Sequence, residues 1–451
     1  MREERRRKKN RSEGERIELT ELQKTIKREI RKDIRRYEEE KIMDIIDDSG
    51  STKKLKKALN RGQYLITRMR NEKGESTGRR EDILEVTTRY YENLYGFKET
   101  ESIKLTPKKG EFTMVMNEDK GIVRVEGKRE DTVPSISESE INKAIRELKN
   151  NKAPGPDKIE NEKIKMFEEA LNSPIKKIFN KILETEEVPK QWKNTEIIII
   201  YKKGNRQDPQ NYRPISLSPS LSKLFTKIIK NRIYNSLDHN QPVEQARFRK
   251  NFSTIDHIHT INQIIEKANE YQIKINMLFI DYCKAFDTIK HEAIWEALEN
   301  QGVQNKIINI IKNLYTDAKA YLKLDRKGRE FKINRGVRQG DPLSPNLFNS
   351  VLEEVFRKTN WDKYGLVIDG KKLNNLRFAD DVILISESSE EIQKMTEELR
   401  KASQKVGLEI NKEKTKFMTN DPNAKIIIDE RVHISGSVNF HGKENGERGG
   451  A

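Results

Sequence analysis

The chain has 451 residues, enough for two or three domains, and its 89 Lys and Arg residues against 73 Asp and Glu residues give a net charge of +16. This positive charge favours a polyanionic partner, a nucleic acid in the simplest case and an anionic membrane surface in the alternative. The single cysteine, Cys283, excludes an intramolecular disulfide framework and a cysteine-rich zinc module.

The N-terminal residues MREERRRKKNRSEGER are charged throughout and lack the apolar stretch of a secretory signal. They are either a solvated basic arm or a nuclear address. No apolar run is long enough to span a bilayer. We therefore expect an intracellular protein, nuclear, cytoplasmic or both, that is not secreted and has no membrane or disulfide partner.

Residues 1–96 are highly charged and poor in glycine and proline, which predicts a helical N-terminal region. Its last part, EDILEVTTRYYENLYGF, has apolar residues at helical spacing between Ile83 and Leu94. Residues 97–133 are polar and irregular, and they are predicted to be a linker.

A denser apolar pattern begins at residue 134. Ser137 and Glu140 have capping-box spacing at the start of a short helix, and Pro174 is expected to open a second helix. The other elements predicted before residue 270 are a strand at EIIIIY (196–201) and helices over 221–229 and 255–265.

The run INMLFID (275–281) predicts a strand that ends at Asp281. Two helices, a hairpin and the Gly- and Pro-rich loop RGVRQGDPLSP follow. A later hairpin, LVIDGKKLNNLRFADDVILIS, contains the adjacent pair Asp380 and Asp381. Residues 421–451 are weakly patterned and are predicted to be a truncated, disordered tail.

Asp380 and Asp381 stand among apolar residues, where two unpaired carboxylates would be costly to bury. Asp281 ends another apolar strand, so three carboxylates converge if the two strands are neighbours in one sheet. Converging carboxylates repel one another, and Mg²⁺ binds such groups together with substrate phosphates. Two such ions support nucleotidyl transfer. The alternative is that each aspartate is an ordinary turn or strand-end residue.

Seven sequence blocks stand in order along the chain: NNKAPGPDKI, IIIIYKKGNRQDPQNYRPISL, QARFRKNFSTIDHI, FIDYCKAFDTIKH, RGVRQGDPLSP, RFADD and GLEINKEKTK. In type and order they resemble the reverse transcriptases of non-LTR (LINE-type) retrotransposons. The resemblance implies an α+β fold over residues 134–420, the fingers and palm of a right-hand polymerase, with helices packed on an antiparallel palm sheet. Complete elements also carry an endonuclease and a thumb. We expect no endonuclease here and a thumb that is truncated or absent.

The resemblance assigns the catalytic metal ligands. In the family, the first aspartate of the DYxKAFD block and the pair in FADD bind two Mg²⁺ ions, with Mn²⁺ as an alternative. By position these ligands are Asp281, Asp380 and Asp381. Lys414 is implied as a general acid for the departing pyrophosphate, with a plain surface lysine as the alternative.

The resemblance also implies residues that contact the base and sugar of the incoming dNTP. Phe286 corresponds to the bulky aromatic residue that lies under the sugar and excludes a 2′-OH; the alternative is a plain core residue. Gln339 and Gly340 belong to the loop that packs against the nascent base pair, where glycine permits close backbone approach.

The triphosphate is expected to be held by Arg213 together with Lys202 or Lys203. Arginine binds phosphate with two hydrogen bonds, and lysine acts as a point charge. The alternative for the two lysines is a solvated hairpin tip.

Arg247 and Asn251 depart from the family pattern, because glycines are usual at both positions. If either position needs a positive φ, its backbone is strained, arginine more than asparagine. Such strain would weaken template handling by the fingers.

These features predict an RNA-directed DNA polymerase that transfers nucleotides from dNTPs to a primer 3′-OH, with an RNA template and a DNA primer as partners. The alternative is a catalytically degenerate retroelement fragment that only binds RNA through its charge. Phe286 disfavours an RNA-templated RNA polymerase. The residues of the FADD and KAFDTI blocks disfavour a group II intron maturase. The oligomeric state is left open.

Overall fold

The computed structural model describes residues 66–96, 133–428 and 431–433, with isolated positions at 28–29, 32, 113–114 and 125–126. The basic arm, the early part of the helical N-terminal region, most of the predicted linker and most of the predicted tail lie outside the described residues. The chain divides into two units, Met1–Thr67 and Arg68–Ala451, and the strands and helices from β1 onward belong to the second.

The second unit is a mixed α+β fold, as predicted, and contains two four-stranded sheets. The first sheet, called here the aspartate sheet, is antiparallel and has the order β12–β13–β7–β14. Its strands are β7 (Asn276–Ile280), β12 (Asn375–Phe378), β13 (Asp381–Ser386) and β14 (Lys416–Thr419).

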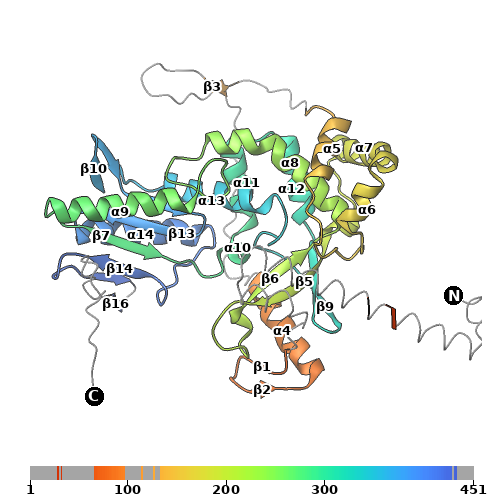
Figure 1. Ribbon diagram of the computed structural model, residues 1–451, viewed down its shortest axis with the longest axis horizontal. Helices are drawn as coiled ribbons and strands as arrows, with labels where there is room; N and C mark the ends of the chain where they lie inside the picture. The colour runs from red at the N-terminus through yellow and green to blue at the C-terminus, as the bar shows by residue number, and fades with distance from the viewer. Residues whose placement is uncertain are drawn as a thin grey trace, which may run out of the picture. The chain divides into compact units, whose positions relative to one another are not determined.

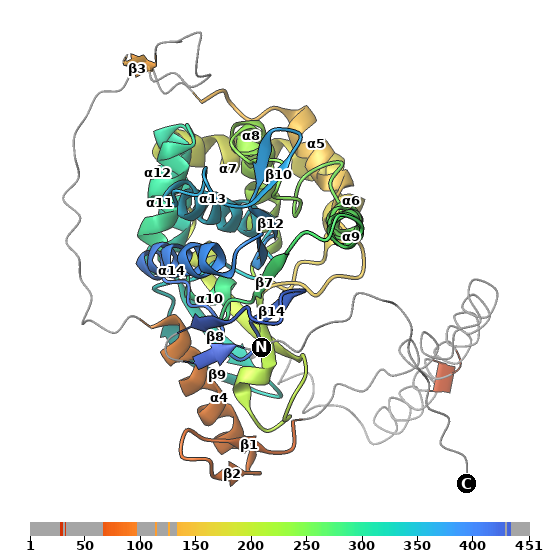
Figure 2. The ribbon, with the colours of Figure 1, turned by 90° about the vertical axis from the view of Figure 1, so that its left-hand side faces the viewer.

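Helices cover both faces of the aspartate sheet. Because side chains alternate along a strand, Leu278 and Leu384 pack in the main core with α14 (Ser389–Lys405). Met277 and Ile385 pack in a second cluster with residues of α9 (Thr254–Glu270). Figure 2 shows α14 and α9 on opposite sides of β7 and β12. Burial on both faces explains why these strands read as continuous apolar runs.

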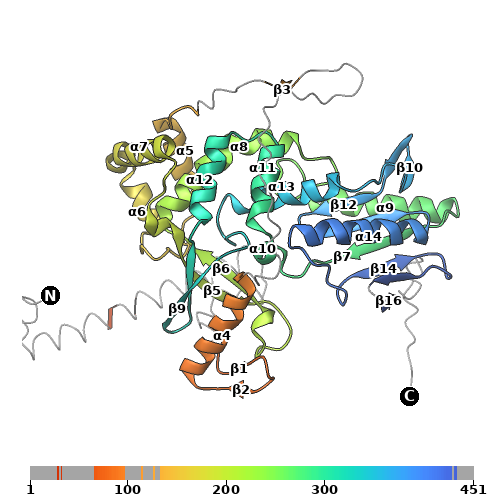
Figure 3. The same ribbon diagram turned by 180° about the vertical axis from the view of Figure 1, so that it is seen from behind.

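The second sheet has the order β6–β5–β8–β9, in which only the β5–β8 pair is parallel. Its strands are β5 (Asn194–Tyr201), β6 (Tyr212–Leu217), β8 (Lys319–Lys323) and β9 (Lys327–Lys332). Pro214 stands in β6, an edge strand, where its missing N–H is tolerated. Helix α4 (Arg80–Tyr95) packs on this sheet through Tyr91 and Tyr95 (Figure 3).

A group of helices packs beside the two sheets and contributes most of the main core (Figure 1). Its members are α5 (Glu138–Arg146), α6 (Asn161–Met166), α7 (Glu168–Thr185), α8 (Ser220–His239), α11 (His291–Asn300), α12 (Asn305–Tyr315) and α13 (Ser344–Arg357). The predicted capping box of Ser137 and Glu140 is confirmed at the start of α5. In the described part of the chain, no helix is long and apolar enough to cross a membrane.

The prediction that Pro174 opens a helix is wrong. Helix α7 begins at Glu168 and continues through the proline. Leu171, Ile175 and Phe179 carry one apolar face across Pro174 into the main core. Burial of this face offsets the loss of one backbone hydrogen bond, a cost of about 3 kcal/mol in a helix interior.

Several short elements complete the second unit. Helix α10 (Ala285–Thr288) follows β7, and two 3₁₀ helices cover Lys190–Lys193 and Pro209–Asn211. The two-stranded pairs are β1 (Met69–Arg70) with β2 (Ser76–Thr77), β3 (Thr113–Met114) with β4 (Val125–Glu126), β10 (Leu366–Ile368) with β11 (Lys371–Leu373), and β15 (Ile426–Ile428) with β16 (Arg431–His433).

Candidate active site

The aspartate sheet brings the three predicted carboxylates to one end. Strands β7 and β13 pair antiparallel with Val382 opposite Ile280, so the next residues, Asp381 and Asp281, lie side by side. Asp380 belongs to the two-residue turn that joins β12 to β13. The prediction that the two strands are neighbours in one sheet is confirmed.

The turn before Asp381 has a strained backbone. Ala379 is fully buried and has a φ of 57°, in the left-handed region that favours glycine. Its N–H donates a hydrogen bond of 3.1 Å to Oε1 of the buried Gln245. Strain of this kind persists where the surrounding structure fixes the backbone, and it is common at functional sites.

Negative charge is concentrated at this end of the sheet. Burial raises the pKa of Asp381, and the carboxylates of Asp380 and Asp281 raise it further. Arg247 and Lys202 act in the opposite direction on that pKa. The site therefore holds three carboxylates whose repulsion is only partly compensated by protein cations.

Lys414 lies at the same place. Its Nζ donates to Oδ2 of Asp281 at 3.1 Å, and both side chains are partly exposed. The prediction placed Lys414 near the departing pyrophosphate, and the structure brings it to one of the carboxylates.

The carboxylate set fits Mg²⁺ in chemistry, although among the described residues no three His, Cys, Asp or Glu side chains converge closely enough to hold a metal ion. Lys414 occupies one oxygen of Asp281, and carboxylates that lack a shared cation repel one another. Carboxylate oxygens are nonetheless the donors that Mg²⁺ prefers. Burial is the main cause of the raised pKa of Asp381, and the neighbouring carboxylates, whose charge a bound cation would neutralise, add to it.

Phe286 stands in α10, close to the carboxylate end of β7. Its ring stacks on Phe348 of α13, with centroids 4.4 Å apart and planes 14° apart. The Phe248 ring meets it edge-on at 6.5 Å. The ring is partly buried, so Phe286 is anchored to the core on one side and still has exposed surface.

The three residues predicted to bind the triphosphate lie on or beside the β5–β6 hairpin. Arg213 is exposed on β6, opposite Ile200 of β5, and its charge partly opposes the rise in the pKa of Asp287. Lys202 follows β5 directly, is exposed, and partly opposes the rise in the pKa of Asp381. Lys203 is exposed one residue further along the turn. The structure thus brings Lys202 within electrostatic reach of the carboxylates.

The loop with Gln339 and Gly340 is held against β6. The carbonyl of Gln339 accepts a hydrogen bond of 2.7 Å from the Ser216 N–H. Gly340 has a φ of 107°, and a Cβ there would lie 3.2 Å from the Ser216 carbonyl oxygen. Only glycine fits this conformation and this approach to β6 without strain.

Sequence reasoning missed Lys284 as a site residue. It has a φ of 46°, and its Nζ lies 4.7 Å from the centre of the Tyr90 ring. Burial lowers its pKa to about 8, and within the described residues the buried Nζ has no hydrogen-bond partner. The available signal was a charged residue inside an apolar strand-to-helix segment, which needs a partner in the fold.

Asp287 makes structural hydrogen bonds. Its carboxylate accepts from the Tyr95 hydroxyl at 2.9 Å and from Nε2 of Gln339 at 2.8 and 2.9 Å. Burial raises its pKa to about 6, although Tyr95, Lys284 and Gln339 oppose that effect. The partner in α4 could not be read from the sequence.

Asp287 is predicted to make the stability pH-dependent. Because its folded pKa of about 6 exceeds the ordinary 3.8, its contribution is fully present below pH 3.8 and is lost as the pH rises through 6. Asp287→Asn removes this dependence. From pH 4 to pH 7, the unfolding free energy of wild type should therefore fall by up to about 3 kcal/mol relative to that of the variant. Urea unfolding at both pH values measures the difference, and a difference independent of pH would contradict the prediction.

Of the two substituted glycine positions, Asn251 needs a positive φ and Arg247 does not. Arg247 is not among the residues with positive φ, whereas Phe248 and Asn251 both have a φ of 64°. Asparagine tolerates this conformation better than most residues do. Arg247 instead places its guanidinium 4.6 Å from the Phe378 ring centre and 4.9 Å from that of Phe248.

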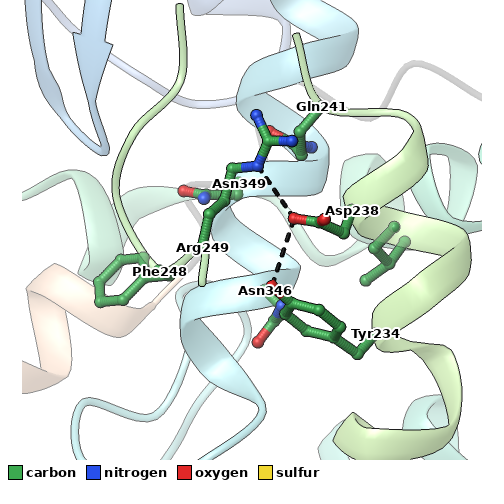
Figure 4. A pocket seen from close by; sticks show the side chains of 8 residues that line it. Tyr234, Asp238, Gln241, Phe248, Arg249, Asn346 and Asn349 are labelled. Carbon is green, nitrogen blue, oxygen red and sulfur yellow. Dashed lines mark hydrogen bonds and ion pairs between the residues drawn. The ribbon is translucent and has the colours of Figure 1, made fainter. Parts of the chain in front are cut away.

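A small polar pocket lies between α8, α13 and the loop before α9 (Figure 4). Arg249 donates to Asp238 at 2.9 Å across it. In the part of the chain described, the amide oxygens of Asn346 and Asn349 and both amide atoms of Gln241 have no hydrogen-bond partner. These groups suit ordered water. The side chains that line the pocket do not include Asp281, Asp380 or Asp381.

Residues 200–442 match the family model described as reverse transcriptase (RNA-dependent DNA polymerase), and the chain belongs to that family. It is related to the reverse transcriptases of non-LTR retrotransposons. It is 30% identical over 262 residues to the Retrovirus-related Pol polyprotein from type-1 retrotransposable element R2 of Nasonia vitripennis, covering 57% of this chain and 25% of that protein. It is 26% identical over 258 residues to the RNA-directed DNA polymerase from mobile element jockey of Drosophila melanogaster, covering 56% and 28%.

The chain thus spans about a quarter of the length of these curated relatives. Among solved structures, apo telomerase from Candida tropicalis truncated from its C-terminal domain aligns at 18% identity with a TM-score of 0.40, covering 56% of each chain. That TM-score is too low to add to the family assignment.

Proposed function

We propose that the chain is an RNA-directed DNA polymerase of a non-LTR retrotransposon, and that it extends a DNA primer on an RNA template. The aspartate sheet with α9, α13 and α14 is the palm, and the β5–β6 hairpin belongs to the fingers. One observation carries the proposal: β7 and β13 place Asp281 beside Asp381, with Asp380 in the adjoining turn.

In this proposal Asp281, Asp380 and Asp381 hold two Mg²⁺ ions, with Mn²⁺ as an alternative. Such ions, when bound, would supply activation of the primer 3′-OH and compensation for the charge on the leaving pyrophosphate. Lys414 changes partner from Asp281 to the pyrophosphate and supplies a proton there. The strained turn at Ala379, fixed by Gln245, presents Asp380 in one orientation.

The incoming dNTP lies between the β5–β6 hairpin and α10. Arg213 binds its phosphates with two hydrogen bonds, and Lys202 adds a point charge, with Lys203 as a weaker contributor. Gln339 and Gly340 contact the nascent base pair. The positive charge of the chain holds the RNA–primer duplex.

Primer extension tests the proposal. The full chain is incubated with an RNA template, an annealed DNA primer, dNTPs and Mg²⁺, and product length is followed with and without a chelator. We expect extension that depends on the template sequence and stops when the metal is removed. Absence of extension, with RNA still bound, would contradict the proposal and favour the RNA-binding fragment.

Phe286→Val is predicted to weaken discrimination against ribonucleotides. Loss of the ring opens the space where a 2′-OH would clash, so the preference for dNTP over rNTP in kcat/KM should fall roughly 10–100-fold. Phe286→Tyr, which keeps the bulk of the ring, is the matched control. Single-nucleotide incorporation with dNTP and rNTP measures both. Equal loss of activity with both nucleotides would assign Phe286 to the core instead.

A further inference from the structure

Helix α4 precedes the residues that match the family model, yet its last turn reaches the proposed nucleotide site. The Tyr95 hydroxyl donates to Oδ1 of Asp287 at 2.9 Å, and both side chains are buried. Both oxygens of the same carboxylate accept from Nε2 of Gln339, at 2.8 and 2.9 Å. One buried carboxylate therefore joins α4 to the loop that faces the nascent base pair.

The connection extends to both sides of the nucleotide site. The Gln339 carbonyl accepts from the Ser216 N–H on β6, the strand that carries Arg213. Asp287 itself belongs to α10, directly after Phe286. Through Asp287, α4 is tied to residues proposed to contact base, sugar and phosphate.

The backbone around this junction is fixed independently of the side chains. The Tyr95 carbonyl accepts from the Asn334 N–H at 3.0 Å, and the Phe286 carbonyl accepts from the Val337 N–H at 2.7 Å. A Cβ on Gly336, which has a φ of 85°, would lie only 2.6 Å from the Asp287 carbonyl oxygen. Because the backbone is fixed in this way, we expect loss of the Tyr95 hydroxyl to free side chains without displacing α4.

We propose that Tyr95 and Asp287 are positioning residues of the nucleotide site, which makes α4 part of the polymerase centre. This inference rests on the proposed function. The Tyr95 hydroxyl orients the Asp287 carboxylate, and that carboxylate holds the Gln339 amide and α10 with Phe286 in the geometry that receives a dNTP. A buried tyrosine with a structural role alone would affect stability and leave dNTP affinity unchanged.

Tyr95→Phe tests the inference because it removes one hydroxyl and keeps the buried ring. Tyr90→Phe, on the same helix, is the matched control and keeps the ring against Lys284. We expect Tyr95→Phe to raise the KM for dNTP roughly tenfold, the scale of a hydrogen bond to a charged group. The kcat, the affinity for primer–template and the values for Tyr90→Phe should stay near wild type.

Asp287→Asn provides a second test, because its amide keeps one acceptor and turns a donor toward Tyr95 or the Gln339 amide. It should raise the KM for dNTP as well. A Tyr95→Phe variant with wild-type KM, or with a loss of kcat alone, overturns the inference. If wild type extends no primer, the proposed function fails first. Equilibrium binding of a fluorescent dNTP to the protein–primer–template complex then decides the inference, which fails if Tyr95→Phe binds as wild type does.

Discussion

Asp380→Asn should reduce primer extension on an RNA template by at least roughly 10²–10³-fold, the scale seen when one electrostatic element of an active site is removed. The amide keeps the size of the side chain and removes the charge that the proposed cations need. The turn should keep its shape, because Gln245 holds the Ala379 N–H and not the Asp380 side chain. RNA binding should be unchanged.

Asp325→Asn is the control, since it makes the same change in an exposed turn between β8 and β9. Initial rates of extension and RNA affinity are measured for both variants beside wild type. Comparable rates for Asp380→Asn and Asp325→Asn would show that the carboxylate site takes no part in the reaction.

Glu353→Gln should lower the free energy of unfolding by about 3–5 kcal/mol, the cost of breaking a buried ion pair by removing one partner. Oε2 of Glu353 lies 2.9 Å from Nη1 of Arg377, and the two side chains are only 7% and 4% exposed. The variant leaves the guanidinium buried over the Phe356 ring with its main countercharge gone. Because Arg377 belongs to β12, the aspartate sheet should loosen with it.

Glu397→Gln is the matched control for this prediction. Glu397 pairs with Arg400 at 2.7 Å on the partly exposed face of α14, and such pairs contribute up to about 1 kcal/mol. Urea unfolding curves of the two variants and wild type give the comparison. Equal destabilisation by both changes would show that burial of the Arg377 pair does not govern its contribution.

Strands β7 and β13 of the aspartate sheet could be predicted from sequence because they are buried on both faces, which gives short, unbroken apolar runs. The chain order of the family blocks then pointed to Asp281 and the FADD pair. Prediction from the local sequence pattern failed where burial in the folded chain overrides it. At Pro174, one buried apolar face continues across the proline, so the helix does not begin there.

The hydrogen bond between Tyr95 and Asp287 lies beyond sequence reasoning for a different reason. The two residues are 192 positions apart in the sequence, and neither the periodicity of apolar residues nor the composition links them. The positive φ of Phe248 was missed as well, because the pattern directed attention to the substituted glycines on either side of it. Backbone conformation in an irregular loop depends on contacts that form only in the folded chain.

Residues 244–246 run beside β12, the edge of the aspartate sheet. The Arg377 N–H donates to the Glu244 carbonyl at 2.8 Å, and the Arg377 carbonyl accepts from the Ala246 N–H at 3.0 Å. Within this segment Gln245 holds the strained turn, and Arg247 follows next to Phe378. An insertion or deletion of one residue here would move the Gln245 amide out of register with Ala379. A chain with such a change would keep its net positive charge and lose its carboxylate geometry, so under the proposed function it would bind RNA and not extend a primer.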